Sequence, residues 1–413
     1  MLNTLHFSTN YESALLDRIK LEKKQVGYYN LPNQNTDYID NYLSQLDAQQ
    51  GLDSITDVVV VGIGGSSLGA KAIYHFLKSL NNLSRQLHFM DSTDPVAIHN
   101  ACLNLNLESC HFLIISKSGT TIETIAIYKY LIEVLKNHSN NQHPFTFITD
   151  QGSKLEAHAK TKSALVVNIQ DNVGGRFSAL STAGLIPLAL AGINIKLLLS
   201  GAEKVQKSFF EAGYMQETLL KKAQFYAENS LTYGINSIFS YSESLKYFNH
   251  WYVQLWGESL GKKQKNSSFN VGLTPIGLIG PKDQHSFLQL LAEGKRDKTV
   301  TFIKLESFDN PLKIPKDTLE GLEALDIING THFSSLINMQ ADSIIESIQN
   351  SQNIPLDEIT LKKQDAFSIG QLIYYYQLLT SMVGDLLNIN TYNQPGVEAG
   401  KNILINKLKS IKW

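Results

Sequence analysis

The alternation of short apolar segments with helical patterns between residues 55 and 200 constrains the fold of this chain more than any other feature. Five segments are nearly continuous in apolar residues, which is typical of strands buried on both faces of a parallel sheet. Each is followed by a polar, Gly-rich or Asp-rich loop. In an open parallel sheet such loops gather at the carboxyl edge, where ligands bind. The five segments cover residues 58–61, 87–89, 112–115, 145–148 and 165–167.

The remaining sequence predicts a second α/β region, with strands at 237–239 and 299–305 and an aromatic helix at 243–258. A length of 413 residues is more than one core usually fills, which favours two domains. We expect an α/β fold of two doubly wound parallel-sheet α/β/α sandwich domains with a C-terminal helical segment. The predicted division is an N-terminal helical segment (1–49), a first domain (50–200), a second domain (201–388), and a C-terminal loop and helix (389–413) with helical periodicity at 400–408.

Composition excludes several classes of function. The chain has 36 Lys and Arg against 38 Asp and Glu, so its formal charge of -2 provides no general field for nucleic acid or an anionic membrane. Any anion must therefore be bound locally. The absence of HExxH, paired CxxC, EF-hand and GxSxG patterns disfavours metal hydrolases and serine hydrolases. We expect neither a metal nor a cofactor.

The sequence also predicts a location. Cys102 and Cys110 are too few for a disulfide framework and favour a reducing compartment. Residues 1–12 lack the pattern of a signal peptide. The uncharged stretch 179–195 is interrupted by Pro187 and Gly192, which favours a buried helix over a membrane span. We expect a cytoplasmic protein without membrane contact.

A glycine-rich loop at 62–69 follows the first predicted strand and opens a helix. It lacks the third glycine of a dinucleotide-binding loop, because Ser67 stands there, and the lysine of a P-loop, because Ala70 stands there. What remains is a tight turn in which backbone, serine hydroxyls and a helix N-terminus could bind an anion. The alternative is a close-packed turn between strand and helix with no ligand.

The segment 116–124 carries the strongest anion-binding pattern. It gathers several hydroxyls, the cation of Lys117 and a helix N-terminus directly after a buried strand. Such a set of donors suits a phosphate monoester without a metal. The alternative is simple capping of the helix by Thr120 or Thr121.

Two further segments carry charged side chains that could take part in catalysis. Arg176, in the sequence Gly-Gly-Arg-Phe-Ser, is one of four arginines and follows the fifth predicted strand, where it could stabilise an oxyanion or form an ordinary salt bridge. Glu258 continues the apolar stripe of the helix at 243–258, so its carboxylate should be partly buried and could act as a base. The alternative for Glu258 is a surface pair with Lys262 or Lys263.

Three residues, one in the second region and two in the C-terminal segment, are less informative alone. His285 follows a Gly/Pro-rich turn at the start of a helical pattern, and a single histidine of this kind is usually structural. Gln394 and Lys401 belong to the segment Asn-Gln-Pro-Gly-Val-Glu-Ala-Gly-Lys, in which Glu398 and Lys401 could simply form a surface ion pair.

Together, these segments resemble the glucose-6-phosphate isomerase (phosphoglucose isomerase) family, whose members have two sugar-isomerase (SIS) type α/β domains. The Gly-Gly-Arg-Phe-Ser and Asn-Gln-Pro-Gly-Val-Glu-Ala-Gly-Lys stretches are the most specific. The chain is shorter than many members, and Leu260 stands where many have Asn after Glu-Ser. The shorter length suggests trimmed loops. The leucine at position 260 affects only a role of that one side chain.

The resemblance implies an aldose–ketose isomerase that interconverts glucose 6-phosphate and fructose 6-phosphate through a cis-enediolate, without a cofactor. Glu258 matches the family base, Arg176 the group that stabilises the enediolate, and His285 and Lys401 the groups that open the sugar ring. The residues implied in binding the sugar phosphate are Gly65, Ser66, Ser116, Lys117, Ser118, Thr121, Thr124 and Gln394.

The resemblance also implies a homodimer with a shared active site, in which the neighbouring subunit supplies the histidine. Two other functions stay open. A dual-specificity phosphoglucose/phosphomannose isomerase would keep the same base and phosphate loop. A noncatalytic sugar-phosphate-binding protein would need the phosphate loop alone, and the presence of Arg176, Glu258, His285 and Lys401 disfavours it.

Overall fold

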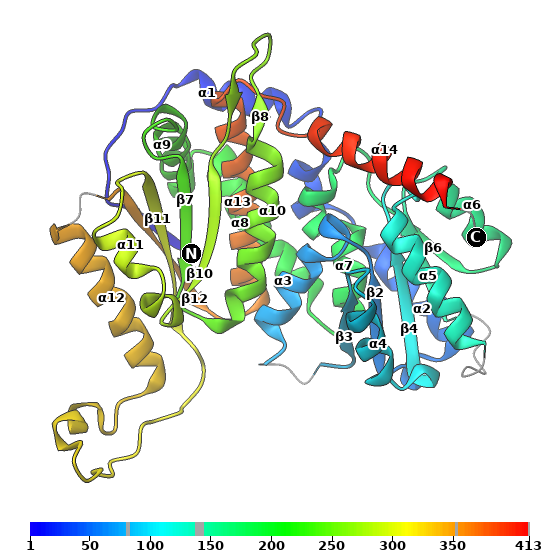
Figure 1. Ribbon diagram of the computed structural model, residues 1–413, viewed down its shortest axis with the longest axis horizontal. Helices are drawn as coiled ribbons and strands as arrows, with labels where there is room; N and C mark the ends of the chain where they lie inside the picture. The colour runs from blue at the N-terminus through cyan, green and yellow to red at the C-terminus, as the bar shows by residue number, and fades with distance from the viewer. Residues whose placement is uncertain (80–82, 137–143, 352–353, 412–413) are drawn as a thin grey trace.

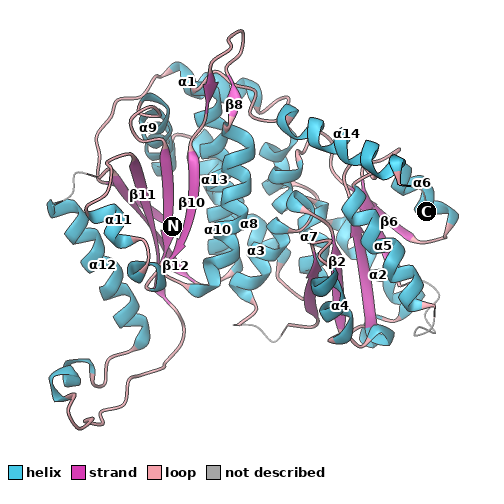
Figure 2. Ribbon diagram, viewed as in Figure 1, coloured by secondary structure: helices cyan, strands magenta, loops and turns pink. Residues whose placement is uncertain are grey.

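The computed structural model describes residues 1–79, 83–136, 144–351 and 354–411. Two five-stranded sheets lie on either side of a central layer of helices, as Figures 1 and 2 show. One buried apolar cluster extends from the inner face of one sheet, through these helices, to the inner face of the other. Smaller clusters cover the outer face of each sheet.

The first sheet is entirely parallel and has the strand order β3-β2-β4-β5-β6. All five strands predicted for this region are confirmed. Alternate residues of β2 join different apolar clusters, because Val58 and Val60 face one layer of helices and Val59 and Val61 face the other. The strands are β2 (Asp57–Val61), β3 (Gln86–Met90), β4 (Cys110–Ile115), β5 (Phe145–Thr149) and β6 (Leu165–Asn168).

Helices cover both faces of this sheet, as expected for a doubly wound domain. The inner face packs against α2 (Asp37–Gln50), α3 (Leu68–Leu77) and α7 (Thr182–Leu190). The outer face packs against α4 (Pro95–Leu103), α5 (Ile122–Leu135) and α6 (Lys154–Thr161). Within the described residues, no helix is long and apolar enough to cross a membrane.

The second sheet has the order β1-β12-β11-β7-β10 and is parallel except for its edge strand β1, which pairs antiparallel with β12. The prediction located β7 and β11 but missed β10, β12 and β1. The expectation of a helical segment at 1–49 is therefore wrong for β1, a four-residue strand too short to show a period. The strands are β1 (Leu2–Leu5), β7 (Ile235–Ser240), β10 (Thr274–Ile279), β11 (Lys298–Ser307) and β12 (Leu356–Lys363).

The helices around the second sheet complete the central layer. Its inner face packs against the helices α9 (Tyr214–Glu228), α10 (Lys246–Leu260) and α13 (Ala366–Leu386), and α8 (Ile195–Phe210) packs against α13. The outer face is covered by α11 (Leu288–Ala292) and α12 (Phe333–Ser351). The predicted aromatic helix is confirmed as α10, although it begins at Lys246 after a short 3₁₀ turn.

The ends of the chain contain the remaining elements. Helix α1 (Ala14–Glu22) and a 3₁₀ helix (Gly27–Asn33) precede α2. A small hairpin, β8 (Lys262–Lys263) with β9 (Asn270–Val271), follows α10 directly. The C-terminal helix α14 (Pro395–Ser410) begins five residues earlier than its periodicity predicts, because Pro395 fits the first position of a helix.

Candidate active site

Two loops of the first sheet meet backbone to backbone beside β2. A Cβ atom on Gly65 would lie 2.1 Å from the carbonyl carbon and oxygen of Gly175, so only glycine fits this contact. The Ser178 hydroxyl lies 2.8 Å from the Gly65 carbonyl oxygen and 2.6 Å from that of Gly175, and donates to them. The glycine-rich loop and the Gly-Gly-Arg-Phe-Ser segment thus form one rigid unit that presents Arg176.

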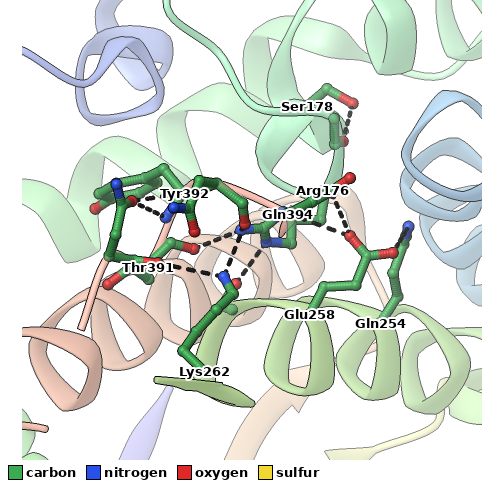
Figure 3. Close-up of polar contacts among 12 residues, drawn as sticks. Arg176, Ser178, Gln254, Glu258, Lys262, Thr391, Tyr392 and Gln394 are labelled. Atoms are coloured by element: carbon green, nitrogen blue, oxygen red, sulfur yellow. Dashed lines mark hydrogen bonds and ion pairs between the residues drawn. The ribbon is translucent and has the colours of Figure 1, made fainter. Parts of the chain in front are cut away.

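Arg176 lies at the centre of the candidate site and is only 2% exposed. Its Nε atom donates to Ser259 Oγ at 2.7 Å, and its Nη2 atom donates to the carbonyl oxygens of Thr391 and Asn393 (Figure 3). Its Nη1 atom lies 3.4 Å from Glu258 Oε2. Burial lowers the pKa of Arg176, and the nearby Glu258 carboxylate opposes this shift. The guanidinium therefore joins three segments that are far apart in sequence.

Glu258 is held at both carboxylate oxygens. Besides Arg176, Gln394 Nε2 donates to its Oε2 at 2.6 Å and Gln254 Nε2 donates to its Oε1 at 3.0 Å. A carboxylate has about four lone-pair directions, so three donors leave room to accept one more proton. The side chain is 33% exposed, which agrees with the predicted partial burial. The alternative, a pair with Lys262 or Lys263, is not found among the described residues.

Gln254 lies one helical turn before Glu258 on α10 and was not among the residues predicted for the site. The signal was available, because residues four apart lie on the same face of a helix. Gln254 also touches the glycine-rich loop, since a Cβ on Gly64 would lie 2.7 Å from Gln254 Nε2. It therefore links that loop to the Glu258 carboxylate.

A cavity of about 950 Å³ opens beside Glu258, within the size range of small-molecule sites. Its walls come from the end of α10, the β8–β9 hairpin and the segment 390–397. The side chains of Lys262, Lys263 and Lys265 give it a positive side. Four residues that contact one another around the carboxylate and the segment 390–394 also line the cavity, namely Glu258, Lys262, Asn393 and Gln394.

The predicted phosphate loop lies at the carboxyl end of β4, next to the glycine-rich loop that follows the neighbouring strand β2. Thr121 occupies the N-cap of α5 but makes no capping hydrogen bond, and its hydroxyl instead contacts Ser116 Oγ at 2.9 Å. The alternative of simple capping is therefore not found at Thr121. The first amides of α5 stay available to a ligand.

The other predicted side chains of this loop differ in their partners and exposure. Ser118 Oγ contacts Thr120 Oγ1 at 3.1 Å, and Lys117 lies 3.9 Å from Asp150, too long for a hydrogen bond. Thr124 is fully buried, and its hydroxyl has no partner among the described residues. Ser66 lies in the 3₁₀ turn Gly64–Ser66 and is partly exposed.

His285 is not brought to Glu258 within one chain. Glu258 lies beside the start of β10, because the neighbouring Gly257 approaches Pro275. His285 lies beyond the other end of that strand, at the last position of the 3₁₀ turn Lys282–His285, and is exposed. A six-residue strand separates the two positions, roughly 17 Å of chain.

Lys401 also lies outside the cavity. It is on α14, 58% exposed, with its ammonium 2.8 Å from Glu398 Oε1, as the surface-pair alternative predicts. Every residue of α14 is exposed, and Figure 1 shows this helix extending away from the central helices toward α6.

Comparison with known proteins gives a consistent picture. The chain is 40% identical to the glucose-6-phosphate isomerase of Campylobacter jejuni over 407 residues, covering 98% of this chain and 97% of that protein. It is 34% identical to the glucose-6-phosphate isomerase of Methanocaldococcus jannaschii, with 97% and 99% coverage. A hypothetical protein from Thermus thermophilus superposes with a TM-score of 0.87 at 30% identity, covering 95% of this chain and 94% of that chain.

Two further results complete the comparison. A crystal structure of glucose-6-phosphate isomerase from Chlamydia trachomatis, 22% identical, shares the fold with a TM-score of 0.79 over 96% of this chain and 84% of that chain. The sequence model of the family described as phosphoglucose isomerase matches residues 33–412, nearly the whole chain. The chain therefore belongs to the phosphoglucose isomerase family.

Proposed function

We propose that this protein is an aldose–ketose isomerase that interconverts D-glucose 6-phosphate and D-fructose 6-phosphate, a step of glycolysis and gluconeogenesis. One observation carries the proposal beyond family membership. A carboxylate with a free lone-pair direction, Glu258, lies against a buried guanidinium, Arg176, at the wall of a cavity. This pairing suits proton transfer next to a carbonyl, which develops negative charge on oxygen.

The residues divide the reaction between them. Glu258 takes the proton from C2 of the open-chain aldose, the C–H electron pair forms the C1–C2 double bond, and the C1=O π pair moves to O1, which gives a cis-enediolate. The same carboxyl then returns the proton to C1 as the C2 carbonyl forms, and the O2 hydroxyl proton passes to O1. Arg176 stabilises the charge on the enediolate oxygens, and Gln394 orients the base. His285 and Lys401 open the sugar ring. The phosphate binds at Gly65, Ser66, Ser116, Lys117, Ser118, Thr121 and Thr124.

The decisive test is NMR of the purified protein with fructose 6-phosphate in deuterated water, without added metal or nucleotide. We expect glucose 6-phosphate carrying deuterium at C2, because the base exchanges its proton with solvent. Mannose 6-phosphate as a second product would indicate the dual-specificity alternative. Binding without product or exchange would contradict catalysis and favour the sugar-phosphate-binding alternative.

The phosphate loop has its own test. The double variant Ser118→Ala and Thr121→Ala removes two hydroxyls at the N-terminus of α5, so we expect the KM for fructose 6-phosphate to rise about tenfold or more with a smaller change in kcat. Thr161→Ala, which removes an exposed hydroxyl on α6, is the control. Unchanged affinity in the double variant would contradict this site.

We also propose a homodimer in which each active site receives His285 from the other subunit. The separation of His285 from Glu258 within one chain supports this arrangement. So do two apolar surfaces. Helix α14 exposes Val397, Ile403 and Leu408, and Figure 1 shows the segment 308–333 extending away from the sheets. That segment exposes Leu312, Leu319, Leu322, Leu325, Ile327 and Phe333.

Mixing two inactive variants tests the shared site. Glu258→Gln and His285→Ala homodimers should each have little activity, whereas mixed dimers contain one site with both native residues. Unfolding and refolding an equal mixture should therefore restore about a quarter of the wild-type activity. The matched control mixes Glu258→Gln with Arg176→Lys, two residues of the same chain's site, and should restore nothing. Equal recovery in both mixtures, or none in either, contradicts the arrangement.

We infer a cytoplasmic location from the expected substrate and from the two cysteines. Cys102 and Cys110 are both free thiols in the structure. Free thiols are the usual state of cysteine in a reducing compartment.

A further inference from the structure

The segment 390–394 positions Gln394, the residue that donates to the Glu258 base, and is held from two sides. On the interior side, the Tyr392 hydroxyl donates to Glu22 on α1 and contacts Ser381 on α13 at 2.8 Å. On the cavity side, the contacts are to its backbone. Arg176 Nη2 reaches the carbonyl oxygens of Thr391 and Asn393.

Lys262 provides the second contact on the cavity side. It is the first residue of β8, two positions after α10 ends, and its Nζ atom donates to Asn393 O at 2.7 Å and to Asn390 O at 3.2 Å. Asn393 O therefore accepts from both Arg176 and Lys262. The peptide unit that carries this carbonyl leads directly into Gln394.

We propose that Lys262 is a positioning residue, whose ammonium group fixes the backbone at Asn390 and Asn393 and thereby holds Gln394 against the Glu258 carboxylate. This inference rests on the proposed isomerase function and adds a residue to it. The short hydrogen bond between Gln394 and Glu258 is the step through which Lys262 acts. A loose segment would let this bond lengthen, and small displacements of a catalytic group cost much rate.

The surroundings of Lys262 make its contacts sensitive to pH. Burial and the neighbouring Arg176 lower the pKa of Lys262 to about 8, while Glu258 raises it less. The other charged groups on the same cavity wall are Lys263 and Lys265. When the ammonium loses its proton, its hydrogen bonds to the two carbonyls lose their charge-assisted strength. We therefore expect kcat to fall as the pH rises through about 8.

Unfolding would not explain that fall. An unfolded lysine keeps its proton up to its ordinary pKa of 10.5, so between about 8 and 10.5 the unfolded chain binds more protons at this group than the folded chain does. The free energy of unfolding contributed by Lys262 therefore rises with pH in this window. Activity and stability should move in opposite directions.

The experiment compares Lys262→Met, Lys262→Arg and the control Lys196→Met, which removes the same charge from an exposed position on α8, outside the cavity lining. The first readout is amide hydrogen exchange of peptides covering residues 388–398 in the dimer without substrate. The second is kcat against pH with fructose 6-phosphate. Lys262→Met should exchange faster in this segment and lose about tenfold or more in kcat at pH 7.

Arginine restores a permanent cation, so Lys262→Arg should keep most of kcat and hold it to a higher pH than the wild type. Lys196→Met should match the wild type in both readouts. Unchanged exchange in Lys262→Met, or faster exchange with kcat within twofold of the wild type, overturns the positioning role. If the wild type shows no isomerase activity, the proposed function fails, and the exchange readout still decides whether Lys262 holds the segment.

Discussion

Replacing Glu258 by Gln should lower kcat roughly 10²- to 10⁴-fold, the range that a positioned general base contributes. The affinity for fructose 6-phosphate should stay within a few fold, because the phosphate loop after β4 is separate from Glu258. Deuterium exchange at C2 should be lost together with turnover, since both need the same proton transfer. Near-normal turnover would contradict the assignment of the base.

The geometry around Glu258 refines this test. Gln254 and Gln394 donate to different oxygens of the carboxylate, so a glutamine at this position cannot accept from both. Some loss could therefore come from displaced neighbours. Glu258→Asp separates the two effects, because it keeps a base but withdraws it by one methylene, and it should retain measurable exchange. Glu217→Gln, an exposed surface glutamate paired with Lys221, is the control for the substitution itself.

The first sheet was predictable because each of its strands carries its own signal. Val58 to Val61 are four consecutive apolar residues, long enough to show burial on both faces, and loops with turn residues follow. In the second sheet, β12 (Leu-Asp-Glu-Ile-Thr-Leu-Lys-Lys) is mostly charged or polar and has no continuous apolar run, and β1 has only four residues. Their positions depend on pairing with each other, which no local pattern records.

Residues of the candidate site could be predicted only where a single stretch of sequence marks them as functional. Arg176 and Glu258 stood out from local sequence, but their contact joins residues 82 apart in the chain. Gln254 was missed, and Lys262 was considered only as a surface partner of Glu258. Each acts through a partner that folding brings near, a carboxylate for Gln254 and two backbone carbonyls for Lys262. The roles carried over from the family resemblance, and the domain boundaries, stay predictions.

The distance between His285 and Glu258 within one chain follows from the direction of α10 relative to β10. Helix α10 runs antiparallel to β10 and carries Glu258 back to the start of that strand. His285 lies beyond the opposite end of β10, in the 3₁₀ turn that follows this strand. The fold therefore places Glu258 and His285 at opposite ends of a strand, and this separation is the reason for proposing that a second subunit supplies His285.

The second large effect is expected at Arg176. Arg176→Lys keeps the charge but replaces a planar fork by one ammonium, which cannot reach Ser259 and the carbonyl oxygens of Thr391 and Asn393 together. Transition-state stabilisation should weaken, and we expect kcat to fall roughly 10²- to 10³-fold. Ser259 is fully buried, and each buried polar group left unpaired costs roughly 1–3 kcal/mol, so the melting temperature should fall as well.

Arg18→Lys provides the matched control, because Arg18 pairs with Glu12 and Asp385 at the surface and is 37% exposed. It should leave kcat unchanged. The two effects at Arg176 can be separated by assaying the variant well below its melting temperature, where the fold is intact. A loss of stability with kcat preserved would show that Arg176 only holds the segments together. A loss of kcat that persists in the folded variant, with the rate of deuterium exchange at C2 reduced equally, would place the guanidinium at the enediolate itself.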